Sequence, residues 1–371
     1  MPHYNKVGTH LRKLAIALVM GGVSVSVQPT SSRAQTLRIE ATSTSMDWNA
    51  VALANGHVFV AGPRWTGFTG PAVGILTKSK DVTPFPNAQW NAWKPGQEAM
   101  HRFVSVNALH TAPDGTLWVV DTGTPSFGGT PVPDGAKLVR IDPATGHVLR
   151  IYPLGSGITQ AGSYVDDIRF NGRHAYLTDA GKAALIVLDT ETGQARRVLE
   201  NHASTHAQPG RPIVIEGHVV ESRPHHPLLV NVDPLEVSPD GKWLYFGPLE
   251  GPWSRVPTAL LDDPGVSSKT LAAAVQPWAD LPPIGGSAMG ADGTLYFTAL
   301  KDNSLYRRDA SGQISKVISD PRLHWADAPA LASDGRLWIP VAQLDRLPQF
   351  HQGHSLIRPP FLLVSVDLMH E

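Results

Sequence analysis

The chain has 371 residues, of which 42% are hydrophobic and only 17% are charged, so it can bury a large core and is neither disordered nor fibrous. A formal net charge of -1, with no basic stripe along the chain, gives no reason to expect nucleic acid as a partner. Abundant Gly (34) and Pro (32) favour many short strands joined by tight turns, and the lack of cysteine excludes disulfides and thiol chemistry.

The N-terminus has the features of a secretory signal peptide. Basic residues precede an apolar stretch over 14–27, and Ser32 and Ala34 supply the small residues of a cleavage site. This predicts a signal peptide over 1–34 and a secreted or periplasmic mature protein. A membrane anchor is the alternative, but 14 apolar residues are too short for a bilayer core of about 30 Å. The mature chain is not expected to span a membrane.

Six segments of the remaining chain then repeat one pattern, in which small, aromatic or β-branched residues flank a tight turn. Each turn has Asn or Asp before a glycine, a pair that tolerates the positive φ of hairpin turns. Each segment is therefore predicted to be a β-hairpin. The turn glycines, in chain order, are Gly56, Gly115, Gly172, Gly241, Gly293 and Gly335.

A second hairpin signature follows several of these copies, at 138–149, 185–193 and 304–312. Two hairpins make one four-stranded blade, and six units in residues 35–371 average about 56 residues each. The sequence thus predicts an all-β fold, a single six-bladed β-propeller domain over 35–371 with four-stranded blades around a central channel. The closing blade is expected to pair residues 37–41 with residues 361–366. A β-sandwich or two small β domains would not predict six similar hairpins.

A series of stretches resembles the major royal jelly protein and Yellow family, including its bacterial members. They are 106–109 leading to 117–123, 175–180 followed by 185–189, 235–241 leading to 244–249, 255–258, and 337–340. The resemblance implies a secreted six-bladed propeller with a ligand pocket at one mouth of the channel. Insect members are linked to pigment chemistry, including dopachrome conversion, and some salivary members bind biogenic amines. The absence of cysteines and of Asn-x-Ser/Thr signals fits a bacterial exported protein better than an insect one.

Alignment of the repeats on their turns predicts a ring of polar residues at one mouth of the channel. Such side chains can instead satisfy nearby backbone donors, as Asn and Asp do in turns. Carboxylates that converge in a partly buried channel are costly, however, unless they share a cation or a proton. We therefore expect a small polar ligand at the ring, which comprises Asn49, Asn107, Asp167, Asp233, Ser287 and Asp327.

One interpretation of this ring is a site for an aromatic amine or a catechol-derived compound. The aromatic ring of the ligand would stack on Trp48, Tyr164 or Trp325. The carboxylate of Asp167 or Asp327 would pair with the cation of the ligand. A tautomerase or isomerase activity would use a carboxylate of raised pKa, or His324, to move a proton. The alternative role of these aromatic residues is packing between blades.

A second interpretation is a lactonase that depends on a divalent metal, as in the regucalcin and gluconolactonase propellers. Asn107, Asp167 and Asp233 resemble the Asn and Asp metal ligands of that group, and their oxygens suit Ca²⁺ or Mg²⁺. The Glu ligand of the first blade has no clear equivalent here.

A third interpretation is a non-enzymatic module that binds another protein through the stretch 202–227. The sequence leaves open whether the protein is an enzyme; a monomer with a small-molecule ligand is expected.

Overall fold

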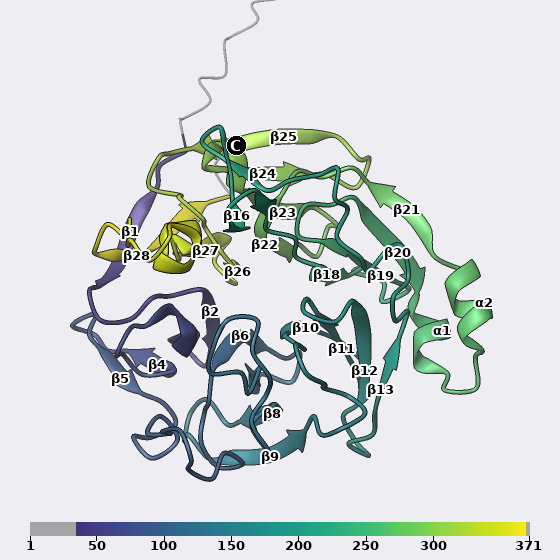
Figure 1. The fold of residues 1–371 in the computed structure, drawn as a ribbon, viewed down its shortest axis with the longest axis horizontal. Helices are drawn as coiled ribbons and strands as arrows, with labels where there is room; N and C mark the ends of the chain where they lie inside the picture. Colours follow the sequence, from purple (N-terminus) through teal and green to yellow (C-terminus); the bar gives the residue numbers. More distant parts are fainter. Residues whose placement is uncertain (1–34, 369–371) are drawn as a thin grey trace, which may run out of the picture. The chain divides into compact units, whose positions relative to one another are not determined.

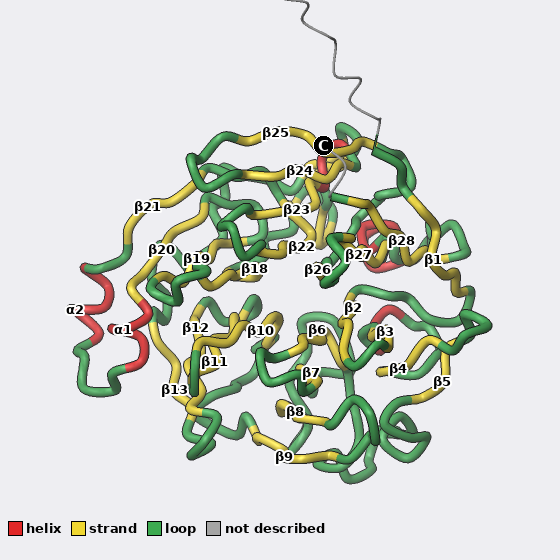
Figure 2. The backbone as a smooth tube through the Cα atoms, turned by 180° about the vertical axis from the view of Figure 1, so that it is seen from behind, coloured by secondary structure: helices red, strands yellow, loops and turns green. Residues whose placement is uncertain are grey.

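Six four-stranded antiparallel sheets are arranged in a ring around a central channel in the computed structural model of the protein, which describes residues 35–368 (Figure 1). The expected signal peptide, residues 1–34, lies outside the described residues. The predicted fold class, an all-β six-bladed propeller, is confirmed. Figure 2 shows the same ring from behind, with strands β2, β6, β10, β18, β22 and β26 nearest its centre.

The first three blades run in chain order from the innermost strand outward. The first contains β2 (Ala50–Ala54), β3 (His57–Ala61), β4 (Val73–Leu76) and β5 (Val82–Pro84). The second contains β6 (Val106–Thr111), β7 (Leu117–Asp121), β8 (Lys137–Ile141) and β9 (Val148–Pro153). The third contains β10 (Val165–Asn171), β11 (His174–Asp179), β12 (Ala184–Asp189) and β13 (Ala195–Val198).

The fourth and fifth blades follow the same order. The fourth contains β18 (Val232–Val237), β19 (Trp243–Pro248), β20 (Trp253–Pro257) and β21 (Gln276–Ala279). The fifth contains β22 (Ile284–Met289), β23 (Leu295–Ala299), β24 (Ser304–Arg308) and β25 (Ile314–Ser319). Repetition of the same sheet around a ring leaves only short strand edges exposed, which limits edge-to-edge aggregation.

The sixth blade joins the two ends of the described chain. Its inner strands are β26 (Ala330–Leu331), β27 (Arg336–Val341) and β28 (Phe361–Asp367), and its outer strand is β1 (Arg38–Ser43). Strand β1 pairs with β28 in antiparallel register, with Arg38 opposite Ser365 and Thr42 opposite Leu362. The predicted closure is confirmed, and it ties the first strand to the last through backbone hydrogen bonds.

The remaining elements are short and belong to the connections. Two helices, α1 (Thr258–Asp262) and α2 (Ser268–Ala273), lie on the outer side of the fourth blade (Figure 1). The others are the two hairpins β14 (Val214–Ile215) with β15 (His218–Val219) and β16 (Glu221–Arg223) with β17 (His226–Pro227), and the 3-10 turns η1 (Arg64–Thr66), η2 (Leu300–Asp302), η3 (Leu344–Arg346) and η4 (Pro348–Phe350). No helix within residues 35–368 is long and apolar enough to cross a membrane.

The turn glycines behave as the repeat predicts. All six have φ between 57° and 83°, a region that is costly for residues with a Cβ. Each turn joins the innermost strand of a blade to the second strand, and the sixth blade has such a turn between β26 and β27. All six turns lie at one end of the channel, because every innermost strand runs in the same sense from the other end.

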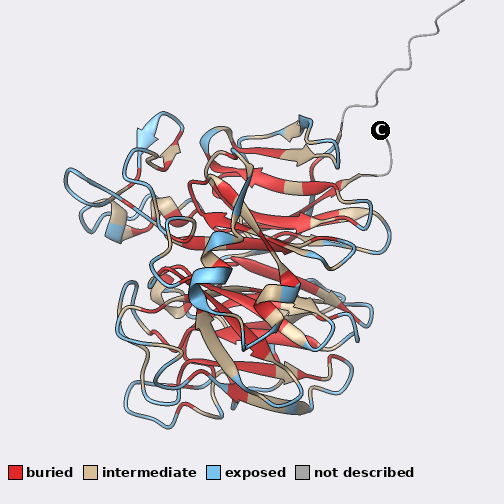
Figure 3. Cartoon of the chain, turned by 90° about the vertical axis from the view of Figure 1, so that its right-hand side faces the viewer, coloured by how far each residue is buried: buried red, intermediate tan, exposed pale blue. Residues whose placement is uncertain are grey.

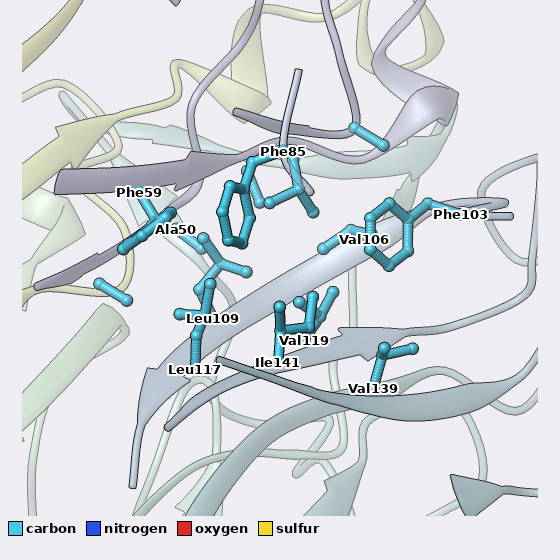
Figure 4. Close-up of a cluster of buried hydrophobic side chains, with 14 of the residues drawn as sticks. Ala50, Phe59, Phe85, Phe103, Val106, Leu109, Leu117, Val119, Val139 and Ile141 are labelled. Carbon is cyan, nitrogen blue, oxygen red and sulfur yellow. The ribbon is translucent and has the colours of Figure 1, made fainter. Parts of the chain in front are cut away.

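The core lies between neighbouring blades rather than inside any single sheet. Figure 4 shows one such layer, in which Phe59 and Phe85 of the first blade meet Val106, Leu117 and Ile141 of the second. Side chains of this size contribute about 1.5–3 kcal/mol each when fully buried. Figure 3 shows buried positions along the strands and exposed ones mainly in the connecting loops. The strands are thus a stable base for functional side chains at either end of the channel.

Candidate ligand-binding site

A β-bulge near the start of the inner strand recurs in four successive blades. The pairing of inner and second strand shifts between Val106 and Ala108, Val165 and Ile168, Val232 and Leu235, and Ile284 and Ser287. A bulge inserts an unpaired residue and re-aims a side chain. The residue that follows the last paired position turns into the channel in each blade. Together with one residue each from the first and sixth blades, these positions are Asn49, Asn107, Asp166, Asp233, Gly285 and Asp327.

These six residues line a cavity of about 390 Å³ at the end of the channel where the inner strands begin, here named the acidic cavity. Four of them, Asn49, Asn107, Asp233 and Asp327, belong to the ring expected from the sequence. The other two positions differ, because Asp166 and Gly285 stand where Asp167 and Ser287 were expected.

Asp167 and Ser287 instead line a second cavity of about 510 Å³, at the end of the channel that carries the hairpin turns. We name it the turn-side cavity. For Asp167 the physical reason is the bulge, which sends Asp166 and Asp167 to opposite ends of the channel although they are adjacent in the chain. In the fifth blade the bulge precedes Ser287, which is the next paired residue of the strand, so Gly285 takes the position in the acidic cavity. The expected ring was found by counting residues back from each turn glycine, and such a count does not reveal the extra residue that a bulge inserts into the strand.

A relay of hydrogen bonds orients the polar groups of the acidic cavity. Asn49 Nδ2 donates to Asn107 Oδ1 at 2.9 Å, and Asn107 Nδ2 donates to Asp166 Oδ1 at 2.6 Å. The Tyr164 hydroxyl donates to the same Asn107 Oδ1 at 2.7 Å and accepts from Trp65 Nε1 at 2.8 Å. The relay fixes the Asn107 amide with its NH₂ group toward Asp166, so that this carboxyl is held from one side.

The carboxyl groups of the cavity are strongly perturbed. Burial raises the pKa of Asp166, Asp233 and Asp327 well above the ordinary value, and their mutual repulsion adds to this effect at each of them. Asp166 and Asp233 are hydrogen-bonded to each other, which raises the pKa of Asp166 and lowers that of Asp233. Asp166 and Asp233 therefore form a coupled pair of carboxyl groups that binds protons more tightly than an ordinary Asp.

Glu250 is a further acidic residue near the acidic cavity, and the repeat in the sequence did not indicate it. It follows Pro248 and Leu249 at the end of β19, outside the hairpin pattern. Burial raises its pKa to about 7, and its Oε2 has no hydrogen-bond partner among the described residues. Its charge raises the pKa of Asp233, so Glu250 adds to the negative potential of the cavity.

Loops from several blades build the walls above this polar floor. Trp65 packs on Phe127 with ring centroids 5.0 Å apart. The ring centroids of Phe127 and Phe350 are 5.6 Å apart. Leu344 and the stretch 228–230 also line the cavity. These loops share a hydrophobic cluster of their own, separate from the layers between blades. The cavity thus has an acidic floor and largely aromatic and aliphatic walls.

The same cluster includes much of the long connection between β13 and β18. Ile213, Ile215, Val220 and Leu228 are buried in it. This connection contains the stretch 202–227, for which binding of another protein was one interpretation. Part of that stretch is therefore already packed against the mouth of the channel.

The four aromatic and histidine candidates divide between the cavity and the core. Tyr164 and Trp325 line the cavity, and Trp325 Nε1 donates to Asp327 Oδ2 at 3.2 Å. Trp48 is fully buried in a core cluster between the first and sixth blades and does not line the cavity. His324 is also buried outside it, where its Nε2 donates to the Asp345 carboxylate at 2.9 Å. His324 is thus placed to hold the η3 segment.

The residues expected to hold Ca²⁺ or Mg²⁺ do not meet at one place. Asp167 faces the turn-side cavity and forms an ion pair with Arg169 at 2.7 Å, whereas Asn107 and Asp233 line the acidic cavity. The Asn107 carbonyl already accepts two hydrogen bonds, which occupy its lone pairs. Across residues 35–368, no three His, Cys, Asp or Glu side chains are grouped as metal ligands. The arrangement of these three residues does not fit a divalent metal ion.

A saturated ion network lies beyond the acidic floor, toward the turn-side cavity. The guanidinium of Arg169 bonds both oxygens of Glu236 at 3.0 and 2.8 Å and Asp167 at 2.7 Å. Its remaining hydrogens reach the carbonyls of Ile168 and Ser287. All five N–H donors are used, so this buried arginine, which lines the turn-side cavity, has no donor left for a ligand.

The fold and the floor of acidic residues define a six-bladed propeller with a polar cavity at one mouth. The family model of the major royal jelly protein matches residues 104–339, and the chain belongs to this family. No protein with curated annotation matches the sequence.

Solved structures with the same fold are similar over nearly the whole chain. Virginiamycin B lyase from Staphylococcus aureus has 13% identity and a TM-score of 0.51, with 90% of this chain and 100% of that chain covered. A gluconolactonase from Xanthomonas campestris has 13% identity and a TM-score of 0.53, with 90% of each chain covered. At this identity the likeness concerns the fold alone.

Proposed function

We propose that the protein binds a small aromatic amine in the acidic cavity. The observation that carries this proposal is the floor of three partly buried carboxyl groups, Asp166, Asp233 and Asp327, beneath aromatic walls. Buried carboxylates are costly when unpaired, and an ammonium group offers the opposite charge and three hydrogen-bond donors. The binding of some biogenic amines by members of the same family supports this ligand class.

The size and chemistry of the cavity suit such a ligand. About 390 Å³ lies within the usual range for small-molecule sites, which combine apolar walls with a few well-placed polar groups. The buried Oδ1 of Asn49 has no partner among the described residues and is a further acceptor for an ammonium group. The rings of Trp65, Phe127 and Phe350 provide the apolar contact for a ligand ring.

Calorimetric titration with tyramine and with 4-ethylphenol tests the proposal. The two compounds share the phenol ring, but only tyramine carries an ammonium group. We expect tyramine to bind at least about tenfold more tightly, because its cation pairs with desolvated carboxylates. Equal affinities would show that the acidic floor does not select the ligand.

The same titration at pH 5 and pH 8 adds a control for charge. Because the pKa values of Asp166, Asp233 and Asp327 are raised, a larger fraction of these groups is protonated at pH 5 than at pH 8. Tyramine stays protonated at both values, so its affinity should increase from pH 5 to pH 8 with release of protons. The affinity of 4-ethylphenol should not change.

The coupled carboxyl pair of Asp166 and Asp233 favours tautomerisation as a second candidate function. A tautomerase removes a proton from one atom of its substrate and returns one to another, which a carboxyl pair of raised pKa can do. Mixing the protein with an aminochrome, a catechol-derived quinone, and following its visible absorbance tests this. Faster decay than in buffer, lost in Asp166→Asn, is expected; equal decay with both proteins would count against catalysis.

The lactonase interpretation has less support, because the expected metal ligands lie in two different cavities. The gluconolactonase among the solved structures shares the fold with this chain, at 13% identity. Activity on a lactone is therefore not part of the proposal.

A further inference from the structure

A groove between the fourth and fifth blades combines arginine and aromatic side chains. It has a volume of about 540 Å³ and lies beside the hairpin turns, at the opposite end of the blades from the acidic cavity. The fourth blade contributes Trp243 and Tyr245 from β19, Arg255 from β20 and Trp278 from β21, and the fifth contributes Arg308 from β24. We name it the aromatic groove.

Ring contacts hold both guanidinium groups in place. Arg255 lies over Trp243 at 4.3 Å from the ring centroid, and Arg308 lies over Trp278 at 4.4 Å. Trp278 also stacks on Tyr245, with centroids 4.0 Å apart. A guanidinium that stacks through its face keeps its N–H groups in the plane, where they can reach a ligand.

Neither arginine forms an ion pair within the described part of the chain. Arg255 donates from Nε and Nη2 to Gln276 Oε1 at 3.1 and 3.0 Å, and Arg308 makes one long bond, 3.5 Å, to the Asp309 carbonyl. Arg255 Nη1 and most donors of Arg308 are left for a ligand. An unpaired guanidinium in such a setting is suited to a carboxylate or phosphate.

The two carboxylates on the rim of the groove are held by their own hairpin turns. Asp240 accepts from the Ser238 hydroxyl at 2.6 Å and from the backbone of Lys242, whose Nζ lies 3.2 Å away. Asp292 accepts from the backbone and the hydroxyl of Thr294 at 3.0 and 2.9 Å. Both therefore have local partners and do not neutralise the arginines by direct contact.

The Tyr245 hydroxyl is a third donor in the same place. Tyr245 lines the aromatic groove together with Arg255 and Arg308, and both cations lower the pKa that burial raises. The phenol makes no hydrogen bond to another residue of the described chain. Two guanidinium groups from adjacent blades and a phenol thus converge on one part of the groove.

We propose that the aromatic groove binds an organic carboxylate, separately from the amine in the acidic cavity. The carboxylate would accept hydrogen bonds from Arg255, Arg308 and the Tyr245 hydroxyl. Its hydrocarbon part would contact Pro239, Pro277 and Met289, which also line the groove. The groove is larger than the anionic group alone requires, which favours a ligand with an apolar body.

Titration of the full chain with phenylacetate, followed through the indole N–H signals of Trp243 and Trp278 in NMR spectra, tests this proposal. Phenylacetamide has the same ring and no charge, and is expected to bind at least about tenfold more weakly. Arg255→Gln and Arg308→Gln should each weaken phenylacetate binding by about tenfold or more. Arg308→Lys, which keeps the charge without the planar fork, should have an intermediate effect.

Arg307→Gln is the matched control, because residue 307 precedes Arg308 in β24 and its side chain lies on the opposite face of the sheet, near Ser315. It should leave phenylacetate affinity unchanged, and each variant should retain the native melting temperature within a few degrees. Three outcomes would overturn the proposal: equal binding of the amide, unchanged affinity in the Arg255→Gln/Arg308→Gln double variant, or an equal loss in Arg307→Gln.

Discussion

Asp166→Asn is expected to weaken tyramine binding by about 30-fold or more, whereas Asp167→Asn should change it less than about threefold. The two substitutions make the same chemical change, from carboxyl to amide, in adjacent residues. Asp166 lines the acidic cavity and is coupled to Asp233, so its substitution removes a carboxylate partner of the ammonium group. Truncating one member of a buried charge pair typically costs 2 kcal/mol or more, which corresponds to about 30-fold.

Asp167 lies at the other end of the channel and pairs with Arg169, which keeps its two bonds to Glu236 in the variant. Calorimetry on both variants, with melting temperatures to verify folding, measures the difference. A larger loss in Asp167→Asn than in Asp166→Asn would mean that the register expected from the repeat, and not the bulge, describes the site.

Lys137→Met is expected to lower the free energy of unfolding by about 3–5 kcal/mol. Lys137 Nζ lies 2.6 Å from Asp121 Oδ2, and both side chains are fully buried. The ammonium group also donates to the carbonyls of Arg102 and Gly135. Its removal leaves the Asp121 carboxylate buried without a counter-charge, and breaking a buried pair in this way has a cost of that size.

Arg140→Met is the matched control, since Arg140 lies on the same strand and pairs with Asp114 at the surface. An exposed pair contributes about 0–1 kcal/mol, so this variant should be nearly as stable as the native protein. Urea unfolding monitored by tryptophan fluorescence gives both values. A loss of less than about 1 kcal/mol in Lys137→Met would show that other groups compensate the Asp121 charge.

Asp121 illustrates how a residue of the family pattern can serve the fold. It ends β7 and accepts hydrogen bonds from the backbone N–H groups of Val104, Ser105 and Gly123. Asp179 has the same position at the end of β11 and pairs with Arg197 at 2.7 Å. Both residues belong to stretches that resemble the family. Both side chains hold the start of their own blade in place and do not line the acidic cavity.

The repeat in the sequence predicted the architecture correctly because its signals are local. An Asn-Gly or Asp-Gly pair adopts a tight turn wherever it lies, and the flanking residues form strands through their own preferences. Six such hairpins, with a second hairpin signature after several of them, were enough to predict the propeller. The pairing of β1 with β28 was expected because a closed ring of blades joins the two ends of the chain.

The sequence by itself therefore determined the blades, the turns, the closure of the ring, and four of the six positions on the acidic floor. Only the tertiary structure decided that Asp166 replaces Asp167, that the walls come from loops, and that two blades form the aromatic groove. Bulges change strand register without a clear mark in composition, and loop contacts join residues far apart in the chain. These features depend on the packing of whole blades, which no short segment contains.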